Sequence, residues 1–198
     1  MQSPITRFSA TRFTAFCMLA AFTVFAAGAA QESTFNAPWS GTVTHVTDGD
    51  TLWVRPASGG KPVRIRIDGV DAPEICQMYG IAAQKALSAR LAKQTVSVQS
   101  SSRDSFGRLL ARVTLIPKVI PKVPPKIPPN VKGSADVGEW LVREGHAWSY
   151  RYRRDNGPYA KHQAAARAAR KGLFATARPE EPRDFRKRHG ACGEAVGQ

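Results

Sequence analysis

The chain has 198 residues and a formal net charge of +14 at neutral pH. This length is enough for one domain with a sizeable hydrophobic core. A charge this large indicates nothing about the fold, but it favours nucleic acid, an anionic surface or another polyanion as the partner.

The first 30 residues have the composition of a signal peptide. Arg7 and Arg12 precede an apolar run over residues 13–27, and small residues follow at Ala27-Gly28-Ala29. This run is shorter than the roughly 20 apolar residues that a membrane-spanning helix needs. We therefore expect cleavage and export, to the periplasm or out of the cell, without stable membrane association. The alternative is an uncleaved N-terminal anchor.

After a short lead-in over residues 31–40, the chain has the pattern of a β-hairpin followed by a third strand. Residues 41–47 and 51–55 are predicted strands, and Asp48-Gly49 between them is a typical hairpin turn. Residues 61–68 alternate between apolar side chains and charged ones, which predicts a half-buried strand. Gly69 then suggests a bulge that re-aims the residues that follow.

Helices and strands are mixed in the rest of the chain. Residues 79–91 and 159–171 have helical spacing, and a further helix begins at the N-cap Asp136 and stops before Gly145. Strands are expected over residues 95–99 and 108–116. The pattern alone predicts a mixed α+β fold. The basic stretches 164–171 and 183–189 are interpreted as solvated surface.

A Pro/Lys-rich segment over residues 117–132 does not fit a compact fold. Proline removes donors from a β-ladder and favours the polyproline II conformation. We interpret the segment as an exposed loop insertion, because additional loop length costs little free energy. A basic arm that touches a nucleic acid backbone is the alternative.

Carboxylates and arginines in the first half of the chain predict a phosphate-handling site. Asp50 and Asp71 are candidate ligands of a hard cation such as Ca²⁺, although Asp-Gly-Asp is also common in hairpin turns. Glu74 follows Asp71 across a proline, which allows both to face one cavity; an acidic cluster at a helix start is the alternative. Arg66 and Arg108 are candidate phosphate clamps, because guanidinium groups bind phosphoryl oxygens bidentately. Singly, each arginine is also compatible with an ordinary surface position.

Six short pieces, in this order and spacing, resemble the staphylococcal nuclease (thermonuclease) family over about residues 41–174. The pieces are Asp48-Gly49-Asp50-Thr51, Arg66, Asp71-Ala72-Pro73-Glu74, residues 104–108, Asp136-Val137 and residues 145–152. The resemblance implies an α+β, mainly β fold: a five-stranded OB-type barrel flanked by three helices. The nuclease-like domain would cover residues 41–176, and residues 177–198 would form a basic C-terminal tail.

The same resemblance implies a Ca²⁺-dependent endonuclease, active as a monomer on DNA and RNA and leaving 3′-phosphate ends. The backbone carbonyl of Ala72 would be a further metal ligand, and Glu74 would position or deprotonate the attacking water. Tyr150 and Tyr152 would line the nucleotide pocket, where aromatic side chains favour single-stranded substrates; the spacing does not decide between them.

The main alternative is a non-catalytic nucleic-acid-binding OB module. Family members that lack the carboxylates and arginines have this role. A binder of another polyanion is a third possibility. The chain also departs from the best-known pattern of the family. It has Ala72, Ser105 and Phe106 where that pattern has threonine, lysine and tyrosine. These departures are expected to affect nucleotide affinity more than the chemistry.

Of the three cysteines, Cys17 lies in the predicted signal peptide and leaves with it. Cys76 and Cys192 remain, and an even pair in an exported protein predicts a disulfide bond. Two free thiols or an intermolecular bridge are the alternatives.

Overall fold

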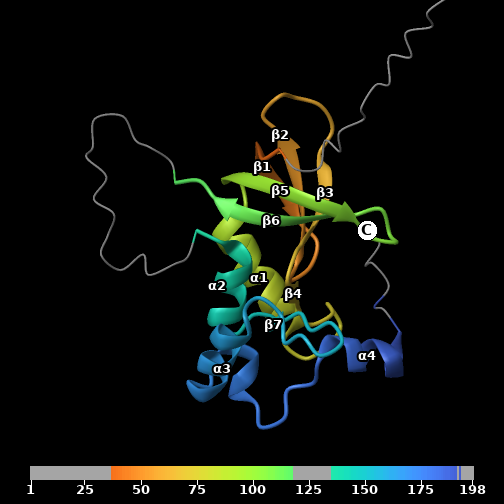
Figure 1. Ribbon diagram of the computed structural model, residues 1–198, viewed down its shortest axis with the longest axis vertical. Helices are drawn as coiled ribbons and strands as arrows, with labels where there is room; N and C mark the ends of the chain where they lie inside the picture. The colour runs from red at the N-terminus through yellow and green to blue at the C-terminus, as the bar shows by residue number, and fades with distance from the viewer. Residues whose placement is uncertain (1–36, 118–134, 191, 193–198) are drawn as a thin grey trace, which may run out of the picture. The chain divides into compact units, whose positions relative to one another are not determined.

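Five strands of the chain close into a β-barrel, as the computed structural model in Figure 1 shows. They are β1 (Trp39–Val46), β2 (Thr51–Pro56), β3 (Val63–Ile67), β5 (Thr95–Arg103) and β6 (Leu109–Leu115). Their order around the barrel is β1-β2-β3-β6-β5, and β5 pairs with β1 to close it. The prediction of an α+β, mainly β fold built on a five-stranded barrel is confirmed.

The structure describes residues 37–117, 135–190 and 192, which belong to one compact unit spanning residues 33–198. The predicted signal peptide lies outside the described residues, and so does all of the predicted Pro/Lys-rich insertion except Pro117. Among the described helices, none is both long and apolar enough to cross a bilayer.

The barrel interior is filled by β-branched and leucine side chains that alternate along each strand. In β3, Ile65 and Ile67 are fully buried, so Arg64 and Arg66 lie on the other face of the same strand. Leu52 and Val54 bury in the same way from β2. This alternation fixes the register of the barrel, because a slip by one residue would turn the arginines into the core.

Helices α1 (Gly80–Leu91) and α2 (Val137–Arg143) pack against the barrel, and α3 (Ala160–Ala168) packs against α2 (Figure 1). A short 3₁₀ helix covers Gly172–Ala175. Asp136 caps α2 as predicted, since its side chain accepts a hydrogen bond from the backbone N–H of Glu139. The helix predicted over residues 159–171 ends earlier, at Ala168, and Arg170 then has a positive φ of 50°.

A fourth helix, α4 (Pro182–His189), was not predicted, so the described residues contain four α-helices rather than three. The helix is short and strongly basic, and Pro182 is its one buried residue. It therefore lacks the apolar periodicity from which the other helices were predicted.

A two-stranded sheet joins two loops beside the barrel. It consists of β4 (Val70–Asp71) and β7 (Trp148–Ser149), with Asp71 opposite Trp148. The backbone N–H of Tyr150 also donates to the carbonyl of Gly69 at 2.9 Å. Strands of two residues carry no periodicity, so this sheet was not predicted, but it brings Trp148, at the start of the segment that carries Tyr150 and Tyr152, next to Asp71.

Cys76 and Cys192 form a disulfide bond, as predicted, with their Cα atoms 5.9 Å apart. The bond spans a sequence separation of 116. In the chain-entropy model, closing a loop of this length stabilises the folded state by about 4–5 kcal/mol, as an upper limit. The disulfide bond also attaches the C-terminal segment, at Cys192, to the loop that follows Glu74.

Candidate active site

Arg66 lies at the centre of the candidate site and joins the two predicted metal ligands. Its Nη1 donates to Asp50 Oδ2 at 2.8 Å, and its Nη2 donates to Asp71 Oδ1 at 3.0 Å. The strand register explains the pair with Asp50, because Thr51 lies opposite Arg66 and so brings Asp50 beside it. Both carboxylates are almost completely buried. Residues predicted separately as metal ligand and phosphate clamp therefore form one buried ion-pair network.

The loops that carry the two aspartates are packed directly against each other. Asp50 Oδ2 accepts a hydrogen bond from the backbone N–H of Ala72 at 3.0 Å. A Cβ atom added to Gly49 would lie 2.7 Å from the Cβ of Ala72 and 2.9 Å from that of Ala83. The glycine of the Asp-Gly-Asp turn is therefore needed for this close approach, in addition to forming the turn.

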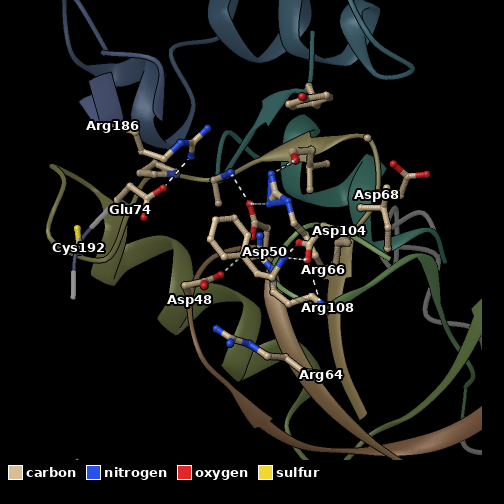
Figure 2. A pocket seen from close by; sticks show the side chains of 18 residues that line it. Asp48, Asp50, Arg64, Arg66, Asp68, Glu74, Asp104, Arg108, Arg186 and Cys192 are labelled. Carbon is tan, nitrogen blue, oxygen red and sulfur yellow. Dashed lines mark hydrogen bonds and ion pairs between the residues drawn. The ribbon is translucent and has the colours of Figure 1, made fainter. Parts of the chain in front are cut away.

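Glu74 lies in the turn between β4 and α1. Its backbone N–H donates to Gln77 Oε1 at 3.1 Å, and its carbonyl accepts from the backbone N–H of Gln77 at 2.8 Å. A Cβ atom on Gly80, the first residue of α1, would collide with the carbonyl of Glu74. The turn is therefore held by the backbone and side chain of Gln77 and by close packing on α1, while the carboxylate of Glu74 lines the cavity described below (Figure 2).

Arg108 approaches the site from the turn between β5 and β6. Its Nε donates to Asp104 Oδ2 at 2.7 Å, and its Nη1 donates to the hydroxyl of Thr51 at 3.3 Å. The guanidinium also lies over the ring of Phe106, 5.4 Å from the ring centroid, and that ring is largely exposed. Where the family pattern has a phenolic side chain, Phe106 thus keeps an aromatic surface but offers no hydroxyl group.

One cavity of about 570 Å³ brings the predicted residues together. The members of the predicted site that line it are Asp50, Arg66, Ala72, Glu74, Arg108 and Tyr150. Asp71 adjoins it through its ion pair with Arg66, and Cys192 lies at its edge. Tyr152 lines a smaller neighbouring cavity of about 300 Å³, to which Tyr150 also contributes. Of the two tyrosines, Tyr150 is therefore the one beside the carboxylates and arginines.

The charges of the site strongly affect one another. Burial, followed by the neighbouring charge of Asp50, raises the pKa of Asp48 to about 6, and the same two causes raise the pKa of Asp71. Burial alone would lower the pKa of Arg66, but the charges of Asp50, Asp71 and Asp48 raise it. The pKa values of these carboxyl groups stay raised although guanidinium groups lie beside them. An additional cation would therefore be favourable at this site.

We expect the metal-free protein to be stabilised by Asp48→Asn at pH 7. A carboxyl whose pKa is higher in the folded than in the unfolded state destabilises the fold once it is ionised in both. A rise from 3.8 to about 6 corresponds to about 2–3 kcal/mol at pH 7, and it falls to less than about 1 kcal/mol at pH 4, because the carboxyl becomes protonated in both states as the pH drops below 3.8. Thermal unfolding in EDTA at pH 7 and pH 4 measures the difference between variant and parent. The exposed Asp184→Asn is the control, and an equal effect of Asp48→Asn at both pH values would contradict the expectation.

Arg186 of α4 is the site residue that sequence reasoning missed. Its Nη1 donates to Glu74 Oε1 at 2.7 Å and its Nη2 donates to Asp71 Oδ2 at 3.1 Å. Figure 2 shows its guanidinium next to Glu74. The stretch 183–189 was interpreted as solvated surface, and for Arg186 this was wrong. The sequence feature that could have located Arg186 at the site is the predicted disulfide, because it attaches this stretch to the loop after Glu74.

The donor set fits a hard cation in its chemistry, since it offers carboxylate oxygens and a backbone carbonyl but no nitrogen or sulfur ligand. Within the described residues, no group of three or more His, Cys, Asp or Glu side chains is arranged as a ready-made metal cage. The carboxylates face guanidinium groups instead.

Comparison with known proteins agrees with the resemblance seen in the sequence. Residues 64–176 match the family model described as staphylococcal nuclease homologue. An uncharacterized endonuclease of Escherichia coli O157:H7 is 32% identical over 148 residues, which cover 75% of this chain and 85% of that protein. An uncharacterized endonuclease of Haemophilus influenzae is 28% identical over 170 residues, covering 86% and 82%. A probable staphylococcal-like nuclease, CAN2, of Oryza sativa subsp. japonica is 28% identical over 124 residues, covering 63% and 29%.

Proposed function

The chain belongs to the staphylococcal nuclease homologue family and is a nuclease, and from this premise we propose that it is a Ca²⁺-dependent endonuclease. Its substrates are DNA and RNA, and its products carry 3′-phosphate ends. The single observation that supports this most is the joint placement of Arg66, Glu74 and Arg108 around one cavity, beside the buried pair Asp50 and Asp71.

The reaction is the attack of water on the phosphorus atom of a phosphodiester. The new bond joins the water oxygen to phosphorus, and the bond from phosphorus to the 5′ oxygen breaks, so the phosphate stays on the 3′ side. Glu74 accepts the proton of the attacking water as general base. The leaving 5′ oxygen takes up a proton as it departs.

Arg66 and Arg108 stabilise the negative charge that develops on the phosphoryl oxygens. Arg108 is suited to this because Asp104 and Thr51 hold its guanidinium in place before substrate binds. Arg66 is held by Asp50 and Asp71, whose charges raise its pKa against the effect of burial, so the buried guanidinium keeps its positive charge. Both groups are fixed in advance, so little reorganisation is needed when the transition state forms.

Asp50 and Asp71, with the carbonyl of Ala72, are the residues that would hold Ca²⁺. Bound there, the ion would supply positive charge to the phosphoryl group and to the attacking water. The family generally depends on Ca²⁺. The raised pKa values of Asp48 and Asp71 support the assignment, because they mark a carboxylate cluster that a divalent cation would relieve.

Substrate binding draws on charge and on aromatic surface. The net charge of +14 attracts a polyanion without selecting a sequence. Tyr150 is half-exposed at the edge of the catalytic cavity, and Tyr152 is exposed in the neighbouring one, so bases can stack on them. We therefore propose single-stranded or locally melted DNA and RNA as the favoured substrates and a monomer as the active form.

We also propose that the protein is exported and acts in the periplasm or outside the cell, without stable membrane association. The disulfide between Cys76 and Cys192 supports this, because such bonds persist in oxidising compartments. The sequence of residues 1–30 supports it independently.

We expect the protein to degrade single-stranded DNA and RNA when Ca²⁺ is present and to stop when EGTA removes it. Loss should be reversible, so restoring Ca²⁺ in excess of EGTA should restore hydrolysis. The 3′ ends can be read from a 5′-labelled oligonucleotide, since its products should change mobility after phosphatase treatment. Full activity after exhaustive chelation would exclude the Ca²⁺ assignment. Binding of nucleic acid without any cleavage would favour the non-catalytic OB module instead.

A further inference from the structure

Helix α4 places a positive charge on the carboxylates that are proposed to act in catalysis. Arg186 reaches Asp71 with both terminal nitrogens, Nη1 to Oδ1 at 3.3 Å and Nη2 to Oδ2 at 3.1 Å. Its Nη1 also donates to Glu74 Oε1 at 2.7 Å. Burial of the guanidinium opposes its charge, but Asp71 and Glu74 more than offset this and raise the pKa of Arg186. A residue from the C-terminal segment thus joins a proposed metal ligand to the proposed general base (Figure 2).

This placement is enforced at both ends of α4. Before the helix, Gln77 Nε2 donates to the carbonyl of Glu180 at 2.9 Å, and Arg151 forms an ion pair with Glu181. After it, the disulfide attaches Cys192 to Cys76, two residues beyond Glu74. Since the residues on both sides of the helix are fastened to the same region, Arg186 is presented to the carboxylates at a high effective concentration.

The contacts of Asp71 leave little room for a further cation. An ionised carboxylate offers about four lone-pair positions. On Asp71, Oδ1 accepts from both Arg66 and Arg186, and Oδ2 accepts from Arg186. A hard cation needs these same oxygens, and it would also repel a guanidinium held a few ångströms away. Arg186 and a divalent cation therefore compete for the same oxygens of Asp71.

We propose that Arg186 is an internal counter-cation that holds Asp71 and Glu74 in the metal-free protein and must leave them when Ca²⁺ binds. The inference rests on the proposed function, because it takes Asp71 as a metal ligand. Helix α4 with its flanking attachments then acts as a strap that competes with the metal. By linkage, loosening the strap strengthens Ca²⁺ binding, and Ca²⁺ binding loosens the strap to the same extent.

The direct test is a calorimetric titration of Ca²⁺ into the disulfide-bonded full-length mature protein, without nucleic acid. We expect Arg186→Gln to lower the dissociation constant for Ca²⁺ about tenfold, within the range usual for coupled sites. Arg186→Lys should fall between the two, because lysine keeps the charge but not the bidentate geometry. Arg183→Gln is the matched control, because Arg183 lies in the same helix but forms its ion pair with Asp184 rather than with Asp71 or Glu74. An unchanged or weaker affinity in Arg186→Gln overturns the proposal.

Two further measurements examine the strap itself, and the second of them, hydrogen exchange, uses the parent protein alone. Reducing the disulfide should tighten Ca²⁺ binding in the parent. It should have no such effect in Arg186→Gln, because the strap of that variant carries no guanidinium that competes with the metal. Amide hydrogen exchange in residues 182–189 should rise when Ca²⁺ is added to the parent. If reduction acts equally in both proteins, or exchange stays constant, the strap does not compete.

The inference and the proposed function fail in different ways. Cleavage that depends on Ca²⁺, together with an affinity that Arg186→Gln does not improve, overturns the inference alone. A protein and variant that neither bind Ca²⁺ nor cleave in its presence overturn both.

Discussion

Replacing Arg108 with alanine will lower the turnover number for single-stranded DNA about 10²–10³-fold, the usual cost of removing one donor to a transition-state oxyanion. The reason is geometric. Asp104 and Thr51 hold the guanidinium at the cavity before substrate arrives, so its charge acts without reorganisation. The loss should appear in kcat rather than in KM, because the charge that Arg108 stabilises develops in the transition state. Steady-state kinetics at saturating Ca²⁺ measure both constants.

The matched control is Arg103→Ala in the same hairpin. Arg103 is exposed and donates to the carbonyl of Gly107, so its loss removes a similar charge from the surface rather than from the cavity. We expect its kcat to stay within about twofold of the parent, with a weaker salt dependence of binding. Near-parental turnover in Arg108→Ala would place the active site elsewhere on the protein.

Arg66→Ala should also abolish most of the activity, but it tests the mechanism less clearly. Arg66 joins Asp50 and Asp71, which are both buried, and its removal leaves two like charges close together. Breaking a buried pair in this way typically costs about 3–5 kcal/mol of stability. A loss of activity would then combine lost chemistry with lost structure, whereas Asp104, the partner of Arg108, is partly exposed.

The individual strands and the main acidic and basic residues were predictable from local patterns in the sequence, whereas the closed barrel was expected only from the resemblance to a known family. Strict alternation around Ile65 and Ile67 identified the strand and the outward direction of Arg66. The Asp-Gly-Asp turn identified its hairpin, although the second role of Gly49, its approach to Ala72, depends on tertiary packing. That these residues would share one site was inferred from their order and spacing, through the resemblance, but the ion pairs that join them were not predicted.

The parts that could not be predicted depend on contacts between distant segments. Helix α4 carries charge but no apolar stripe, so what fixes it is a disulfide and ion pairs rather than its own sequence. The pairing of β4 with β7, which distinguishes Tyr150 from Tyr152, involves only two residues on each side. The bond from Arg66 to Asp50 depends on the register of β2 against β3, and the bond from Arg66 to Asp71 depends on how the chain returns past Gly69 into β4.

Replacing Glu74 with glutamine will lower kcat about 10²–10⁴-fold, the range expected when a general base is removed, while nucleic acid binding persists. Glutamine keeps the size of the side chain and can still accept a hydrogen bond from Arg186 through its carbonyl oxygen, so α4 should remain in place. It cannot take up a proton from water. Turnover should therefore fall under single-turnover conditions, with the dissociation constant for single-stranded DNA close to that of the parent.

Glu144→Gln is the control, because Glu144 pairs with Lys171 and Arg143 away from the cavity and should leave turnover unchanged. The comparison separates two roles that the geometry permits for Glu74. If it acts as the base, Glu74→Gln loses kcat and keeps the Ca²⁺ affinity nearly intact. If it acts mainly as a counter-charge for Arg186, the neutral amide keeps the hydrogen bond but weakens the attraction to the guanidinium, so the variant should bind Ca²⁺ more tightly and lose little turnover. A Glu74→Gln variant with parental kcat would therefore exclude the general-base role and leave Glu74 as a counter-charge for the strap.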